Sequence, residues 1–174
     1  MSPMNSALIS YWHRLPAESP AARRKTLDAI RDRVRAGLEA RSALVPFALG
    51  DVEDGIVAEA AKAYVANPAG LTDADALTEA TEWVRRGLAL NRGAVFGALL
   101  ALEDEGVVER LAALRLVLSA AEIESACRVL GAAPGPHATA FLRDWLELIG
   151  EGPLARERRA LSGLLEADRN AWAA

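Results

Sequence analysis

The chain has few of the residues that crosslink proteins, bind metals or catalyse reactions. Its 174 residues include one cysteine, Cys127, and two histidines, His13 and His137. A single cysteine excludes an internal disulfide and gives no zinc-binding spacing, so a reducing cytoplasm is the simplest location. Neither histidine has a second ligand three or four residues away. We therefore predict no metal, no cofactor and no catalytic residue, and interpret Cys127 as a small buried hydrophobic residue.

Aromatic residues and long apolar runs are also scarce. Aromatics make up 5% of the chain, although hydrophobic residues make up 52% and are mostly Ala and Leu. This composition favours helix over sheet. The longest apolar run, residues 94–102, contains a glycine and is far shorter than the roughly 20 residues that span a bilayer. We expect an all-α, soluble chain with no membrane partner and no secretion signal.

Lysine is nearly absent, since Lys25 and Lys62 are the only two and all other basic residues are arginine. With abundant Ala, this pattern fits the codon usage of a GC-rich bacterial genome. The charge is uneven: 8 basic and 4 acidic residues lie in 1–50, 5 and 12 in 51–110, and 7 and 8 in 111–174. An acidic middle repels a phosphate backbone. Nucleic acid is therefore an unlikely partner.

An internal repeat is the strongest positive signal. Residues 41–65 align without a gap on residues 92–116, at an offset of 51 residues. Repeats of this length are typical of stacked helical hairpins, because one hairpin cannot bury its apolar face alone. We expect Gly55 and Gly106 to occupy equivalent positions. The identical pairs are Arg41/Arg92, Ala43/Ala94, Leu49/Leu100, Gly55/Gly106, Val57/Val108 and Ala61/Ala112.

Hydrophobic periodicity predicts about nine helices in a single all-α domain, residues 1–174. The domain divides into N-terminal helices (1–40), the duplicated units (41–133) and a C-terminal helical hairpin (134–174). The expected helices cover 5–15, 20–40, 42–49, the segment from the cap at Asp51 to about 66, 73–90, 92–102 and 106–118, then one helix through Ile123 and Leu130, one through Phe141 and Trp145, and a last one at 154–172.

Local signals mark where helices start, bend and bury their apolar faces. Pro46 is expected to bend its helix, because an interior proline lacks the N–H group and clashes with the preceding turn. Leu38 and Leu88 extend the apolar stripes of the helices at 20–40 and 73–90, so both should be buried. The acidic groups at 51–54 and 103–105 are expected to start helices. The expected caps are Ser19, Asp51, Thr72 and Ser119.

The segment ALVPFALGDVEDGIVAEAAKAYV resembles a HEAT repeat. It matches that family at Pro46 in the first helix, Asp51 in the turn and Val57 at the start of the second helix. The resemblance covers about residues 41–118. It departs from the family at Ala58 and Glu109, where arginine is common, and in the second copy Gly97 and Leu102 replace the proline and the aspartate. The resemblance implies a short α-α superhelix that acts as a binding scaffold. An irregular helical bundle is the alternative architecture.

The leading functional hypothesis is a cytoplasmic, non-catalytic protein–protein interaction scaffold or adaptor, with a homodimer as a special case. Two alternatives stay open: a HEAT-like nucleic-acid-binding protein, and a small helical enzyme or ligand carrier with a pocket between hairpins. No signature assigns a reaction. Arginines on one helix face, and a tryptophan just off an apolar stripe, point to a partner surface. The candidate partner-binding residues are Arg24, Arg31, Arg35, Trp83, Arg85 and Arg86.

Overall fold

The computed structural model describes residues 18–131 and 134–149, and these residues form an all-α structure. The predicted fold class is confirmed. The described residues contain eight α-helices and two 3-10 helices, and their only β interaction is an isolated bridge between Ala66 and Thr72. The expected helices at 5–15 and 154–172 lie outside the described residues.

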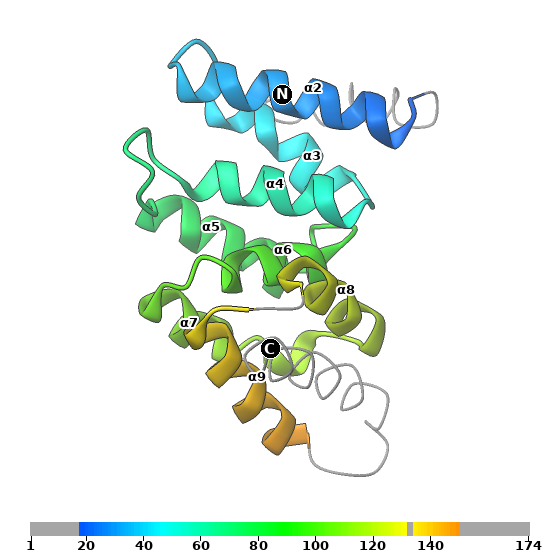
Figure 1. Ribbon diagram of the computed structural model, residues 1–174, viewed down its shortest axis with the longest axis vertical. Coiled ribbons are helices and arrows are strands. Elements are labelled where there is room, and N and C mark those ends of the chain that lie inside the picture. The colour runs from blue at the N-terminus through cyan, green and yellow to red at the C-terminus, as the bar shows by residue number, and fades with distance from the viewer. Residues whose placement is uncertain (1–17, 132–133, 150–174) are drawn as a thin grey trace, which may run out of the picture.

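The helices stack along the long axis of the molecule, from α2 at one end to α9 at the other (Figure 1). In one series α2, α4, α6 and α8 pack on each other in turn, and in a second series α5 contacts α7 and α7 contacts α9. The bounds are α2 (Pro20–Arg35), η2 (Arg41–Leu44), α3 (Val45–Gly50), α4 (Asp54–Val65), α5 (Ala74–Arg85), α6 (Arg92–Leu100), α7 (Glu105–Ala112), η3 (Arg115–Val117), α8 (Ala120–Leu130) and α9 (Pro136–Ile149).

One apolar core runs through the stack from Leu27 in α2 to Trp145 in α9. Aromatic residues reinforce its C-terminal part, where the ring centroid of Phe96 lies 5.8 Å from that of Phe141 and 5.4 Å from that of Trp145. Such tilted ring pairs add a stabilising contribution beyond that of buried area. The few aromatic residues of the described chain therefore serve packing.

Side chains cap most of the helix starts. Ser119 and Glu122 form the predicted reciprocal capping box at α8. The expected cap at Thr72 is wrong, because the adjacent Asp73 accepts the hydrogen bond at the start of α5. The capping side chains are Ser19, Asp73, Asn91, Asp104 and Ser119, each accepting from the backbone N–H three residues later.

The expected cap at Asp51 is also wrong, because this carboxylate is completely buried and pairs with Arg23 of α2. Arg23 Nε donates to Asp51 Oδ2 at 2.8 Å, and Nη2 donates to Oδ1 at 3.3 Å. Asp51 Oδ1 also accepts from the backbone N–H groups of Val52 and Glu53. The pair thus ties α2 to the turn between α3 and α4.

Proline and glycine residues determine helix ends that hydrophobic periodicity predicted at the wrong positions. Pro46 does not bend a helix; it lies in the first turn of α3, where its missing N–H needs no partner. Gly37 and Gly87 take left-handed φ values of 74° and 66°, which end α2 and α5. Leu38 and Leu88 therefore lie beyond the helices and are 66% and 51% exposed, so their expected burial is wrong.

The two copies of the repeat start their helices alike but sit in different surroundings. Gly55 and Gly106 are each the second residue of a helix, α4 and α7, and their predicted equivalence is confirmed. The burial differs. Most of α4 is buried, whereas the buried side chains of α7 are Val107 and Leu111. Equivalent starts therefore lead to unequal packing.

Glu103 has a role that sequence reasoning missed. It adopts a left-handed φ of 57°, unusual for a residue with a side chain. Its carboxylate accepts hydrogen bonds from the backbone N–H groups of His137 and Ala138, at 2.8 and 3.1 Å. Glu103 therefore caps α9, while the neighbouring Asp104 caps α7.

Helices α6 and α8 approach each other at the level of the backbone. A Cβ atom added at Gly97 would lie 2.8 Å from the carbonyl oxygen of Ala126, and one added at Gly93 would overlap the carbonyl of Glu122. The pairing of 93 with 122 and of 97 with 126 shows that the two helices run in the same direction. Glycine is required here for close approach.

We predict that Gly97→Ala lowers the free energy of unfolding by about 1–3 kcal/mol, because the new methyl group would push α8 away from α6. Urea denaturation of the full chain measures this change. Gly106→Ala is the matched control, since the nearest atom to its new methyl group is a single side-chain oxygen, Asp104 Oδ1, at 3.3 Å, and no backbone of a neighbouring helix lies within 4 Å; its effect should lie within about 0.5 kcal/mol or be stabilising. Equal effects at both positions would contradict the close-contact explanation.

We also predict that Leu111→Ala lowers the free energy of unfolding by about 2–5 kcal/mol. Leu111 has no exposed surface, so removing its side-chain carbons would leave a cavity in the core. Denaturant unfolding monitored by circular dichroism provides the measurement. A change near zero would show that the α7 stripe does not support the core.

Candidate functional site

A groove of about 590 Å³ lies along the C-terminal halves of α2 and α4. We call it the α2–α4 groove. Its walls carry more positive than negative charge, although the chain as a whole has a net charge of −4. The charged residues that line it are Arg31, Arg35, Arg41, Lys62, Glu39 and Glu59.

The register of α2 on α4 determines which charges face each other. The two helices run side by side in the same direction (Figure 1), with Arg24 next to Gly55 and Arg31 next to Glu59. One turn further along, α2 carries Arg35 and α4 carries Lys62, and both line the groove. One helical turn of the α2–α4 pair therefore brings opposite charges together, and the next helical turn carries two positive charges.

Arg31 is largely neutralised by its neighbours. Its guanidinium lies 3.3 Å from Asp28, 3.7 Å from Asp32 and 3.5 Å from Glu59. Arg35 and Lys62 differ, because neither has a carboxylate within 4.0 Å among the described residues. The uncompensated positive charge of the groove is thus concentrated at these two side chains.

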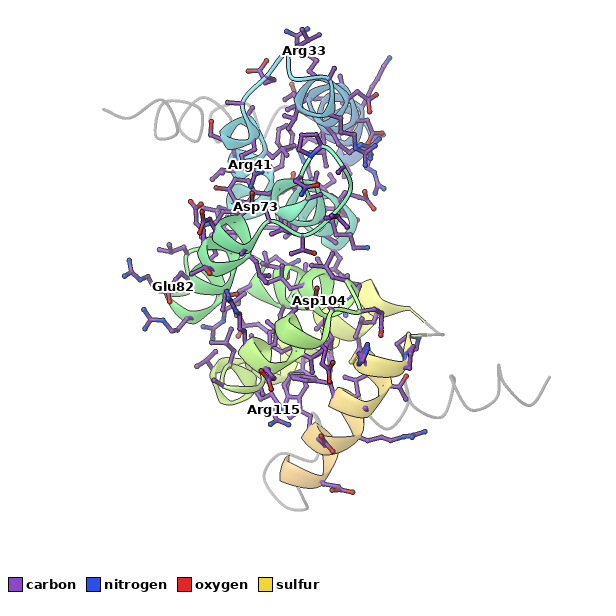
Figure 2. The ribbon with its side chains drawn as sticks, turned by 90° about the vertical axis from the view of Figure 1, so that its left-hand side faces the viewer. Arg33, Arg41, Asp73, Glu82, Asp104 and Arg115 are labelled. Carbon is purple, nitrogen blue, oxygen red and sulfur yellow. The ribbon has the colours of Figure 1, made fainter. Side chains whose placement is uncertain are left out.

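Arg41 braces the wall of the groove. Its Nη2 lies 3.5 Å from Asp73 Oδ2, and its guanidinium lies 5.6 Å from the centre of the Tyr64 ring. Figure 2 shows Arg41 and Asp73 close together on one side of the stack. Burial and a 2.5 Å hydrogen bond to Glu79 raise the pKa of Tyr64 well above its usual range. The Tyr64 hydroxyl donates this hydrogen bond to Glu79 Oε2 of α5.

The groove also has apolar lining residues. Val34, Ala63 and Leu102 line it. Leu38 and Leu71, in the loops that follow α2 and α4, are 66% and 67% exposed, the highest values among the described large hydrophobic side chains, but neither lines the groove. The groove therefore combines free cations with apolar surface.

The predicted partner-binding arginines of α2 divide between two places. Arg31 and Arg35 line the groove, whereas Arg24 lies at the other end of the helix pair, beside Gly55. Sequence reasoning missed Lys62 and Arg41. Periodicity within one helix could not find them, because their proximity to α2 depends on how α2, η2 and α4 pack together.

The predicted role of Trp83 as an exposed anchor is wrong. Trp83 is only 4% exposed, and its ring centroid lies 4.8 Å from that of Tyr64. Because α5 contacts α4, α6 and α7, its buried face is wider than one apolar stripe. Arg85 and Arg86 are exposed, but both pair with Glu82, at 2.6 and 3.2 Å, and neither lines the groove.

A second polar cluster connects α4, α6 and α8. Asn91 Nδ2 donates to Asp54 Oδ1 and Arg128 Nε donates to Asp54 Oδ2, both at 2.7 Å. Burial would raise the pKa of Asp54, but the hydrogen bonds from Arg128 and Asn91 outweigh it and lower the pKa. Arg128 also bonds to Ser125. These polar groups satisfy each other, so the cluster has a structural role.

The described residues contain no cluster of three or more His, Cys, Asp or Glu side chains that could hold a metal ion. His137 lies exposed at the start of α9, and His13 lies outside the described residues. No helix of the described chain has the length and apolar character needed to cross a membrane. Comparisons with protein-family models, curated proteins and solved structures find no match.

Cys127 is partly buried in α8, and burial raises its pKa to about 11. We predict that the native thiol reacts with Ellman's reagent at pH 8 on the order of a hundredfold more slowly than the thiol of the urea-unfolded chain, because the thiolate is the reacting form. Absorbance at the released thiolate's band gives the rates. Equal rates in the two states would show that Cys127 is an accessible, ordinary thiol.

Proposed function

We propose that the chain is a non-catalytic protein-interaction module that binds an acidic segment of a partner protein in the α2–α4 groove. The observation that carries the proposal is the pair of like charges, Arg35 and Lys62, that line one groove without a carboxylate partner among the described residues. Two cations that face one space repel each other, and an anion between them turns this repulsion into attraction.

The rest of the surface supports a selective role for this pair. Most other arginines of the described chain have a nearby carboxylate, including Arg31, Arg33, Arg85, Arg92 and Arg128. A stack of helices is also a suitable frame for a binding surface, as the HEAT resemblance implies. The proposal includes a cytoplasmic location, for which the single free cysteine is the support.

A protein segment fits the groove better than nucleic acid does. Duplex DNA carries about one charge per 1.7 Å of its axis, so it requires a long basic surface. The α2–α4 groove offers two uncompensated cations, Arg35 and Lys62, rather than a long basic surface, and residues 51–110 carry 5 basic and 12 acidic groups. A short acidic segment can reach the two cations without lying along the acidic region.

A small-molecule carrier is the second candidate, and the size of the groove favours it specifically. Its volume of about 590 Å³ lies in the range of roughly 300–1,000 Å³ that is typical of ligand pockets. A small carboxylate could bridge the same two cations. The two candidates differ in whether a longer acidic chain binds more tightly than a free dicarboxylate.

We predict that Arg35→Glu/Lys62→Glu weakens binding of a fluorescein-labelled oligoglutamate peptide at least tenfold, measured by anisotropy at low salt. Two reversed charges at partly exposed positions account for a loss of this size. Lys25→Glu/Arg143→Glu is the matched control: it makes the same charge change at two exposed residues outside the groove.

The control variant should bind as the wild type does, and circular dichroism should show that both variants are folded. No binding of oligoglutamate by the wild-type chain, or equal losses in the two variants, would refute the proposal. Tighter binding of duplex DNA than of oligoglutamate would support the nucleic-acid alternative. Equal binding of free glutarate and oligoglutamate would favour the small-molecule carrier.

A further inference from the structure

We propose that the acidic group bound in the α2–α4 groove is the phosphoryl group of a phosphorylated serine in the partner segment. This inference rests on the proposed function and names the chemical group that the groove selects. At neutral pH a phosphoserine has about two negative charges and three strong acceptor oxygens. The side chains that we assign to it, Arg35, Lys62 and Asn67, all line the groove.

Four of the seven polar or charged side chains that line the groove are already paired within the chain. Arg31 lies next to three carboxylates, one of which belongs to Glu59. Arg41 lies 3.5 Å from Asp73, and Glu39 lies 3.4 Å from another arginine of α2. Both carboxylates of the groove therefore have an arginine partner, and neither is left free to attract a cationic ligand.

The three remaining polar side chains of the groove, Arg35, Lys62 and Asn67, have only donor groups to offer a ligand. Asn67 Oδ1 accepts from the backbone N–H groups of Ala69 and Leu71, at 2.9 and 3.0 Å. These bonds identify the amide oxygen, so Nδ2 is the end of the amide that has no hydrogen bond to a described residue. A guanidinium and an ammonium group contain no acceptor atom. The free groups therefore match a ligand with several acceptor oxygens.

The packing of α2 on α4 brings the three donors to one end of the helix pair. Arg35 is the last residue of α2, and Lys62 lies in the last turn of α4. Both follow by about one helical turn the contact in which Arg31 lies 3.5 Å from Glu59. Asn67 comes directly after the C-cap residue of α4. The donors thus come from two helix ends and the adjoining loop, and they face one groove.

Charge and the number of acceptor oxygens favour a phosphoryl group over a carboxylate. One carboxylate has a single negative charge, so it leaves one of the two positive charges of Arg35 and Lys62 uncompensated. A phosphoryl group places about two negative charges at one point. A guanidinium can bind two of its oxygens side by side, and the third oxygen then remains for Lys62 or for the amide of Asn67.

Two fluorescein-labelled peptides test the inference against the full chain by anisotropy. They share one neutral sequence and differ at two central positions, which are phosphoserine and alanine in one peptide and two glutamates in the other. At about pH 7.5 the two peptides have nearly the same charge, because the second pKa of phosphoserine is about 6. We expect the wild-type chain to bind the phosphoserine peptide at least tenfold more tightly, since one group then bonds to all three donors.

Arg35→Lys separates hydrogen-bond geometry from charge. It keeps the positive charge but removes the planar fork, so the preference for phosphoserine should fall below about threefold while binding of the diglutamate peptide changes by less than about twofold. Arg143→Lys is the matched control, because Arg143 is exposed and does not line the groove. It should keep the full preference.

Inorganic phosphate should displace the phosphoserine peptide only at concentrations far above those of the unlabelled peptide, because a peptide also contacts the apolar lining of the groove. Equal potency would identify a free anion as the ligand and overturn the inference. A wild-type chain that binds both peptides equally, or an Arg35→Lys variant that keeps the full preference, would also overturn it and leave the proposed function intact. If Arg35→Glu/Lys62→Glu binds both peptides as the wild type does, the proposed function itself fails.

Discussion

The buried ion pair between Arg23 and Asp51 is the contact on which the position of α2 depends. Helix α2 is rich in charged residues, and the side chains it buries are Arg23 and Leu27. Beyond Leu27, the apolar residues of α2 that pack against the core are Ile30 and Val34, and both are only partly buried, so apolar attachment is thin at this end of the stack. A buried charge is strongly destabilising without its partner, so the pair tolerates few alternative positions of α2. It specifies where this helix lies more than it adds to stability.

The α2–α4 groove follows from that attachment. Once Arg23 is held at the turn before α4, the helical repeat of both elements places Arg31 beside Glu59 and then brings Arg35 and Lys62 to one space. A shift of α2 by one turn would separate these residues. The candidate site is therefore a consequence of helix register, and residues distant in sequence meet because one buried contact sets that register.

Sequence reasoning succeeded where the physics is local. The capping box of Ser119 with Glu122 and the equivalent starts at Gly55 and Gly106 need only a few adjacent residues, and they were predicted correctly. Leu38 was misplaced because the left-handed turn at Gly37 depends on backbone conformation that periodicity does not show. Only part of the α2–α4 groove was predicted from the sequence. Lys62 joins Arg35 through tertiary packing, and Trp83 is buried because α5 has several neighbours.

The sparse attachment of α2 also implies unequal stability along the stack. Local openings cost least where few buried contacts are broken, so α2 is the element expected to detach first, while the close contact between α6 and α8 persists. A ligand that bridges α2 and α4 binds only while α2 is attached to the stack, so it stabilises the attached state by mass action. Binding in the groove should then slow amide hydrogen exchange throughout the N-terminal end of the stack, including at residues far from the groove.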